Sequence, residues 1–353
     1  MKYYSCWMIE DFHLNIVGRL DTGNTYLNFC CTENIASRPP GISFYDTARE
    51  TVDAHRRERA ECIGESVKHS ISFAPDIPPV PEKGRCAGCA LFKLGDWSGG
   101  DGLIHHVNLG MTPAPCQCKC IYCDIRDGNK KNGTFKKRLH AGHYEKLFDV
   151  LDYVKSEKLV APDAPWHVAS GEISIHPYRE RIFDLVRDQN VMFFTNCFRF
   201  DERIAENLAK NPRSRIYLSI DAGTPKTWRK VKGVDNFDAV TDNLVKYYAS
   251  SAAPGQIKLK YIVLPGVNAN LGDYLSVIEI MKALRVKHLD IAREFNAKYA
   301  PGAEQRDDLI GAAAYLAAML VKNEMTFDMS TYTPDENEKI AALGCELLQS
   351  GEV

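Results

Sequence analysis

Strand-like and helix-like segments alternate along most of this chain, and this alternation limits the possible folds more than any other feature. Short apolar runs lie at about 103–109, 165–170, 190–196, 214–221, 257–264 and 287–292, and helix-like stretches follow at 141–157, 177–188, 201–210, 236–250, 271–284 and 304–322. Repeated strand–helix units form parallel sheets. Six of them predict an α/β fold with a partial, TIM-like (βα)6 barrel. Parallel barrels place their chemistry at the carboxyl ends of the strands.

The length of 353 residues allows one large domain and a smaller one. We expect a small cysteine-rich domain in residues 1–100, the barrel in residues 101–322, and a C-terminal extension in residues 323–353 that packs on the barrel. Within the first domain, the residue pattern predicts a hairpin from strands at 12–17 and 26–29, and a helix over 46–67.

Charge and composition exclude several classes of protein. A net charge of −2 gives no broad basic surface, so nucleic acid is not an expected partner. No apolar run approaches the roughly 20 residues that span a membrane, and the N-terminus lacks the apolar core of a signal peptide. Twelve cysteines in such a chain indicate metal rather than disulfides, which predicts a reducing, cytoplasmic location.

The densest group of cysteines comes just after the first barrel strand. Cys116, Cys120 and Cys123 have the spacing C-x3-C-x2-C. Three thiolates this close can hold three irons of a 4Fe–4S cluster and leave the fourth iron open to a small molecule. A structural zinc site or a closed iron–sulfur site is the alternative. Cys118 is outside the pattern, and we interpret it as a bystander, although it could substitute as a ligand.

This cysteine run resembles the signature of the radical SAM superfamily. Ser170-Gly171-Glu172 is similar to the Gly-Gly-Glu motif of that family, and the segment 219–225 resembles its Ser-Ile-Asp-Ala-Gly-Thr-Pro segment. The resemblance covers about residues 103–300. It implies an enzyme whose reduced cluster cleaves S-adenosylmethionine (SAM) to methionine and a 5′-deoxyadenosyl radical, which takes a hydrogen atom from a substrate.

The resemblance also implies roles for residues at the ends of the barrel strands. Those implied to surround SAM are Tyr122, Gly171, Glu172, Asn196, Ser219 and Ile262. Glu172 would accept hydrogen bonds from the SAM ammonium, and Ser219 would bind the ribose or the methionine carboxylate. Ile262 or Leu264 would flank adenine, with core packing as the alternative. The alternative interpretation of Gly171-Glu172 is an ordinary turn without a role in binding.

Three further features stay open at this stage. Asp221 is either a site residue or the N-cap of the next helix. Lys232 stands where relatives often carry arginine, and it could meet a carboxylate. Asp290, Arg293 and Glu294 either bind substrate at the barrel rim or form a solvated rim.

Cysteines before the barrel suggest a second metal centre. Cys86 and Cys89 have C-x2-C spacing, and Cys6 with Cys30 or Cys31 at a hairpin end would complete four thiolates. The pattern resembles a SPASM or twitch-type auxiliary module, which implies a second 4Fe–4S cluster. A zinc site made by the same cysteines is the competing interpretation. Cys62 is interpreted as a plain thiol.

These features together predict an oxidoreductase that oxidises or crosslinks a peptide or small-molecule substrate, with flavodoxin or ferredoxin as electron donor. An auxiliary cluster would accept the electron that remains on a product radical. One alternative is a redox-neutral epimerase in which Cys197 or Cys345 donates a hydrogen atom, although Cys197 could simply be packed. A second alternative is a non-catalytic iron–sulfur or zinc-binding protein.

Overall fold

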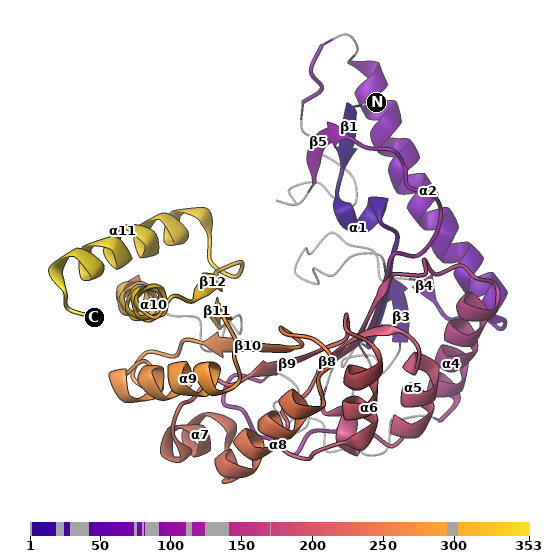
Figure 1. The fold of residues 1–353 in the computed structure, drawn as a ribbon. Coiled ribbons are helices and arrows are strands. Elements are labelled where there is room, and N and C mark those ends of the chain that lie inside the picture. The colour runs from indigo at the N-terminus through magenta and orange to yellow at the C-terminus, as the bar shows by residue number, and fades with distance from the viewer. Residues whose placement is uncertain are drawn as a thin grey trace. The chain divides into compact units, whose positions relative to one another are not determined.

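The computed structural model describes residues 2–18, 25–28, 42–73, 76–79, 81, 92–110, 115–123, 141–169, 171–294 and 303–353 (Figure 1). They divide into two compact units. The first consists of residues 1–114, 134–170 and 180–191, and the second of residues 115–133, 171–179 and 192–353. The domain boundaries expected after residues 100 and 322 stay predictions.

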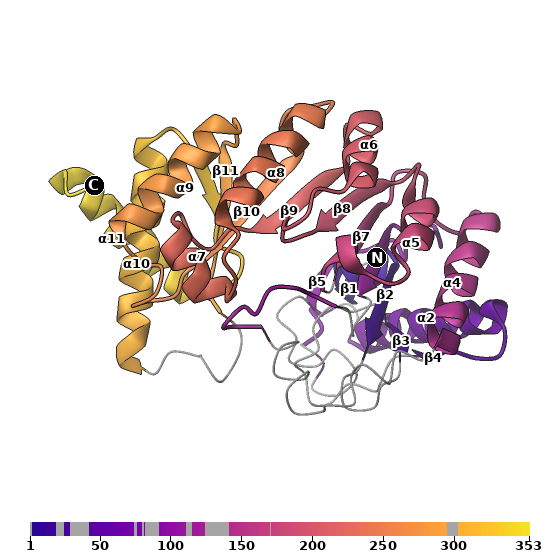
Figure 2. The same ribbon diagram turned by 90° about the horizontal axis from the view of Figure 1, so that it is seen from below.

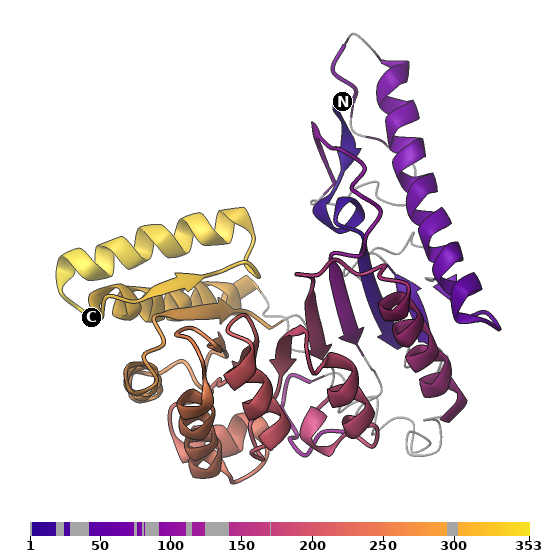
Figure 3. The same cartoon turned by 45° about the vertical axis from the view of Figure 1, so that its right-hand side comes forward.

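The larger sheet of the first unit has β2 at its middle (Figure 3). Its strands, in spatial order, are β7 (Pro165–Ala169), β6 (His106–Gly110), β2 (His13–Gly18), β3 (Thr25–Asn28) and β4 (Ile42–Ser43). β2 and β3 pair antiparallel, which confirms the expected hairpin. β2 also pairs parallel with β6, with His13 opposite His106. The N-terminal hairpin therefore extends the strands of the expected barrel, which local periodicity did not indicate.

A second, two-stranded sheet in this unit joins β1 (Lys2–Ser5) antiparallel to β5 (Lys93–Asp96). The helices of the unit are α1 (Trp7–Glu10), α2 (Ala48–Ser72), α4 (Ala141–Ser156) and α5 (Arg179–Val186). α2 packs against β1 and α4.

The long helix α2 begins at a capping box. The Thr47 hydroxyl accepts from the Glu50 N–H, and the Glu50 carboxylate accepts from the Thr47 N–H. Its buried side chains follow a spacing of three and four residues, which puts them on one face of a helix: Val52, His55, Arg59, Cys62 and Ser66.

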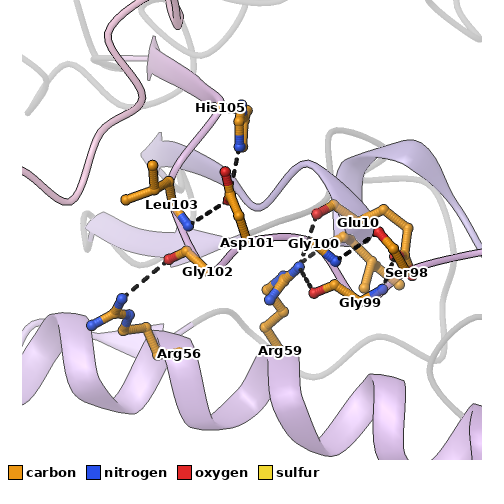
Figure 4. Close-up of polar contacts among 11 residues, drawn as sticks. Glu10, Arg56, Arg59, Ser98, Gly99, Gly100, Asp101, Gly102, Leu103 and His105 are labelled. Carbon is orange, nitrogen blue, oxygen red and sulfur yellow. Dashed lines mark hydrogen bonds and ion pairs between the residues drawn. The ribbon is translucent and has the colours of Figure 1, made fainter.

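Arg59 ties this buried face to the glycine-rich segment 98–102 (Figure 4). Its guanidinium donates to the carbonyls of Glu10 and Gly99, both at 2.8 Å, and to that of Ile9. The Glu10 carboxylate in turn accepts from the Gly99 N–H at 2.8 Å. α1, α2 and the glycine-rich segment are thus held together by hydrogen bonds to backbone groups.

In the described part of the second unit, five strands run parallel in the order β8–β9–β10–β11–β12 (Figure 2). They are β8 (Asn190–Phe194), β9 (Arg215–Ser219), β10 (Ile257–Ile262), β11 (His288–Ala292) and β12 (Thr326–Asp328). The connecting elements are the 3-10 turn η2 (Ile173–Ile175) and the helices α6 (Glu202–Lys210), α7 (Pro225–Lys232), α8 (Phe237–Ser250), α9 (Leu271–Ala283), α10 (Ala303–Lys322) and α11 (Pro334–Ser350).

Burial alternates along the strands of this unit, as period-two geometry requires. Ile216, Leu218, Leu259, Leu289 and Ile291 are at most 1% exposed and form one face of the sheet, which belongs to the core. The residues that alternate with them are only partly buried and lie on the other face: Tyr217, Lys258, Lys260, His288 and Asp290. In the described part of the chain, no helix combines the length and apolar character needed to cross a membrane.

Candidate active site

The cysteine run lies in the second unit, and the residues described around it are 115–123. Cys116 is exposed, and Cys118, Cys120 and Cys123 are partly buried. The pKa of Cys116 is lowered chiefly by a hydrogen bond with Cys118, and the same kind of bond, helped by Lys232, lowers the pKa of Cys120 to about 6. These contacts raise the pKa of Cys118. The arrangement favours thiolates at Cys116 and Cys120 and a protonated thiol at Cys118.

The C-terminal end of α7 fixes the backbone of this loop. The Lys119 N–H donates to the Lys232 carbonyl at 2.7 Å, and the Ile121 N–H donates to the Val231 carbonyl at 2.9 Å. Gly233 ends the helix at φ 67°, and a Cβ there would lie 2.9 Å from the Cβ of Lys119. Glycine therefore allows both the left-handed turn and the close approach of the loop.

A buried ion pair between Lys232 and Asp221 also contacts this loop through Tyr122. The Lys232 ammonium donates to Asp221 at 2.5 Å, to the Tyr122 hydroxyl at 2.8 Å and to the Ser219 carbonyl at 2.7 Å. The Tyr122 hydroxyl also donates to Asp221. Lys232 is 4% exposed and Asp221 is fully buried. Burial alone would lower the pKa of Lys232, but the Asp221 carboxylate and nearby groups raise it overall.

Asp221 connects this network to two strands. Its second carboxylate oxygen accepts from the Ile262 N–H at 2.7 Å, and its carbonyl accepts from the Asn268 side chain at 2.9 Å. Its φ of 43° is left-handed. The N-cap of α7 is Thr224, whose hydroxyl accepts from the Thr227 N–H. Asp221 is therefore not the helix cap, and its role as a site residue stays a prediction.

Glu172 is fully buried and lies beside the turn that follows β8. Its carboxylate accepts from the Thr195 hydroxyl at 2.9 and 3.0 Å, from the Asn196 N–H at 2.7 Å and from the Ser174 N–H at 3.1 Å. The Glu172 N–H donates to the Pro115 carbonyl at 2.8 Å, next to the first ligand candidate. Burial raises the pKa of Glu172.

Gly171 and the residues after β8 complete the surroundings. Gly171 has a φ of 72°, which suits glycine. The Asn196 amide reaches the sulfur of Cys116 at 3.5 Å and the side-chain oxygen of Gln117 at 3.4 Å. Cys197 is fully buried with φ 53°, and burial raises the pKa of its thiol. The side-chain amide of Asn243 donates to the Cys197 carbonyl at 2.9 Å.

Ile262 packs in an apolar cluster directly beside the cysteine loop. The buried members of the cluster are Val231, Ile262, Leu264 and Ala292, and the partly buried members are Ile121, Tyr122 and Val267. Asn196, Asp221 and Ile262 thus follow or end three neighbouring parallel strands, β8, β9 and β10. The cysteine loop lies where barrel enzymes have their chemistry.

The residues present suit an iron–sulfur cluster. Among the described residues, no three His, Cys, Asp or Glu side chains converge on a single ion. A four-iron cube does not need such convergence, because each thiolate binds a different iron. The side-chain amide nitrogen of Gln117, beside Cys116, is buried and has no acceptor in the described structure. A bound cluster or SAM would supply one.

Only one of the candidate auxiliary ligands, Cys6, is among the described residues. Cys30, Cys31, Cys86 and Cys89 lie outside the described residues. Cys6 is buried with Met8, Ile9 and Cys62, against Ile63 and Phe92. Cys62 lies three residues after Arg59, and this helical spacing predicts that both side chains lie on the buried face of α2. The auxiliary cluster stays a prediction.

The parallel strand–helix units carry a three-cysteine loop at their strand ends, an arrangement that suits an iron–sulfur cluster on a barrel. Residues 115–278 match the radical SAM superfamily model. The expected partial-barrel α/β fold is confirmed.

Two solved structures have a similar fold. Streptococcus suis SuiB bound to the precursor peptide SuiA is 14% identical with a TM-score of 0.51, and the match covers 90% of this chain and 60% of that chain. SuiB bound to S-adenosylmethionine is 14% identical with a TM-score of 0.50, and the match covers 82% and 57%. The chain thus spans less than two thirds of the SuiB chain, and at this identity the likeness concerns the fold alone. No curated protein matches the sequence.

Proposed function

We propose that this protein is a radical SAM enzyme that abstracts a hydrogen atom from its substrate through a 5′-deoxyadenosyl radical. The observation that carries the proposal is the fixation of the cysteine loop. Backbone bonds to α7 and the Lys232–Asp221–Tyr122 network hold it at the ends of β8, β9 and β10. A loop held by protein groups keeps its thiolates in position for a cluster with an open iron.

In this proposal Cys116, Cys120 and Cys123 hold the 4Fe–4S cluster. The cluster, when bound and reduced by flavodoxin or ferredoxin, supplies the electron that cleaves SAM to methionine and the 5′-deoxyadenosyl radical. Glu172 accepts from the SAM ammonium, Gly171 lets the backbone approach, and Asn196 and Ser219 bind polar groups of SAM. Ile262 and Tyr122 provide the adjoining wall.

We favour an oxidation or crosslink of a peptide or small molecule in the cytoplasm. The deoxyadenosyl radical removes one hydrogen atom, and an acceptor must then remove one electron while a proton leaves. A second 4Fe–4S cluster on Cys86, Cys89, Cys6 and Cys30 or Cys31 is the proposed acceptor. A peptide is the first substrate class to test, because SuiB, which has a similar fold, was crystallised with a precursor peptide.

The test is the formation of 5′-deoxyadenosine. Protein reconstituted anaerobically with iron and sulfide should form it from SAM after reduction with dithionite. Cys116→Ala, Cys120→Ala and Cys123→Ala should each abolish it, whereas Cys118→Ala, the matched control in the same loop, should retain it. A protein that only binds a cluster or zinc would form none. An inactive Cys118→Ala beside an active Cys116→Ala would contradict the ligand assignment.

Cys197 keeps a redox-neutral epimerisation open as a second candidate, because it directly follows Asn196, whose amide reaches Cys116. Its thiol would return a hydrogen atom to the substrate radical. A thiol exchanges its proton with water, so turnover in deuterium oxide should then label the product, and Cys197→Ala should form deoxyadenosine without product. A product free of solvent deuterium would exclude this role.

A further inference from the structure

Polar side chains form a row across the partly open face of the second unit's sheet. Lys260 of β10 is opposite Ser219 of β9 and opposite Asp290 of β11. All three are partly buried, whereas Leu259 and Leu289, the residues before Lys260 and Asp290, are at most 1% exposed. Because side chains alternate along a strand, the row lies on the face opposite the apolar core.

The acidic member of this row already has donors. Asp290 accepts from the Nε2 of His288 at 3.1 Å and is hydrogen-bonded to the hydroxyl of Tyr217. The Asp290 carboxylate is near enough to Lys260 to raise its pKa, but the two side chains form no ion pair.

Lys260 differs from its neighbour Lys232 in its contacts. Lys232 directs its ammonium at three oxygen acceptors. Among the residues that the structure describes, no oxygen lies within hydrogen-bonding distance of the Lys260 ammonium. The ammonium instead lies 5.9 Å from the centre of the Tyr217 ring. Burial lowers the pKa of Lys260, with opposing effects of Asp221 and Asp290. A partly buried ammonium without a hydrogen-bond acceptor can bind an anion that reaches it.

The position of Lys260 relates it to the proposed chemistry. It precedes Ile262 by two residues on the same strand, and Ile262 borders the cysteine loop through Tyr122. Asp221 and Lys232, which support that loop, are close enough to Lys260 to affect its pKa. A group bound at Lys260 would therefore lie next to the proposed SAM site, two residues before Ile262 on β10.

We propose that Lys260 binds a carboxylate of the substrate and so selects an acidic substrate for this site. The inference rests on the proposed function, because it assigns a substrate group to the same strand ends. A lysine ammonium is a compact point charge that suits a single carboxylate, and the face of the Tyr217 ring lies against it.

The first experiment measures protection of lysines from acylation by N-succinimidyl acetate, with succinate as the probe. The full-length, reconstituted protein is labelled with and without succinate and mapped by mass spectrometry. Succinate at about ten times its Kd should slow acylation of Lys260 about tenfold by mass action. The exposed Lys226 of α7 serves as the internal control and should be unaffected.

Each other outcome overturns the proposal. A Lys260 that is not acylated at all cannot be reached by substrate. Equal protection by the neutral analogue succinamide would exclude recognition of charge. Protection by inorganic phosphate but not by succinate would assign the site to a phosphate group instead. Equal protection of Lys226 would show non-specific binding.

A second measurement does not depend on labelling. In calorimetric titrations of succinate, Lys260→Met should lose about tenfold or more in affinity, and Lys226→Met should bind as the wild type does. Unchanged binding by Lys260→Met overturns the proposal. Neither measurement needs turnover, so a failure here is distinct from a failure to form deoxyadenosine, which would overturn the proposed function.

Discussion

Lys232 carries a buried charge that is paired with Asp221 and bonded to two neutral oxygens, and its removal would leave Asp221 as a buried anion without its cation. We expect Lys232→Met to lower the free energy of unfolding by about 3–5 kcal/mol, as is typical when one partner of a buried pair is lost. Lys232→Met combined with Asp221→Asn should recover much of this loss. Urea unfolding followed by circular dichroism measures both effects.

The control for this prediction is Lys230→Met, because Lys230 is an exposed residue of the same helix and should cost under about 1 kcal/mol. The pH dependence has a definite sign. The folded pKa of Lys232 is raised above the ordinary 10.5, so its stabilisation is complete below that value and is lost as the pH rises through the folded pKa. Equal destabilisation by both single variants would contradict the structural role.

Glu172 offers a second test on a single side chain. Glu172→Gln keeps the shape of the side chain beside Thr195 and Asn196 but removes the negative charge proposed to meet the SAM ammonium. The affinity for SAM should fall about thirtyfold, or about 2 kcal/mol, while the absorbance of the cluster is retained. Equilibrium SAM binding to the anaerobic protein measures this. The exposed Glu206→Gln is the control, and unchanged affinity in Glu172→Gln would refute the contact.

Among the secondary-structure elements, α2 is attached to α1 and the segment 98–102 by two arginines, of which Arg59 makes most of the bonds and Arg56 donates to the Gly102 carbonyl at 3.1 Å. Arg59 donates to three backbone carbonyls in different directions, and the single ammonium of lysine cannot reproduce this fork. Arg59→Lys should therefore lower the free energy of unfolding by about 2–3 kcal/mol, measured by urea denaturation. Arg57→Lys, on the exposed side of α2, should have no comparable effect. Equal effects would mean that the fork contributes nothing.

Sequence periodicity predicted most elements within two or three residues, because alternating and helical apolar patterns are local. The strand at 257–264 is observed as β10 at Ile257–Ile262, whereas the helix at 46–67 is observed as α2 at Ala48–Ser72 and extends five residues further than expected. α7 was missed, since its eight residues contain four cations and little apolar pattern. The pairing of β2 with β6 was also missed, because register between segments about 90 residues apart is not encoded in either segment alone.

The candidate site was predicted in part for the same reason. The cysteine spacing and Gly171-Glu172 are local motifs, and the structure brings Glu172 and Asn196 close to the cysteine loop. The contacts of Lys232 with Asp221 and Tyr122 join three segments and depend on the tertiary fold. The sequence offered one indication of this network, which was Lys232 at a position where relatives often carry arginine.

For the whole molecule, the prediction concerns the number of clusters. Two 4Fe–4S clusters would give about eight irons per reconstituted chain. Ala substitution of Cys116, Cys120 and Cys123 together should leave about four irons, and Ala substitution of Cys86 and Cys89 should remove the other set while some SAM cleavage persists. Iron analysis and electron paramagnetic resonance measure the two sets. A triple variant that keeps no iron and binds zinc instead would remove the electron acceptor from the proposed oxidation.

The two backbone bonds that join Lys119 and Ile121 to the end of α7 have a consequence for the assembly of the cofactor. They involve only amides and carbonyls, so they form when the polypeptide folds and need no iron. The entropy of ordering this part of the loop is then lost during folding and does not reduce the affinity for the incoming cluster. In the metal-free chain this part of the loop would already be ordered for cluster binding. A damaged cluster could then be removed and replaced without refolding of the barrel.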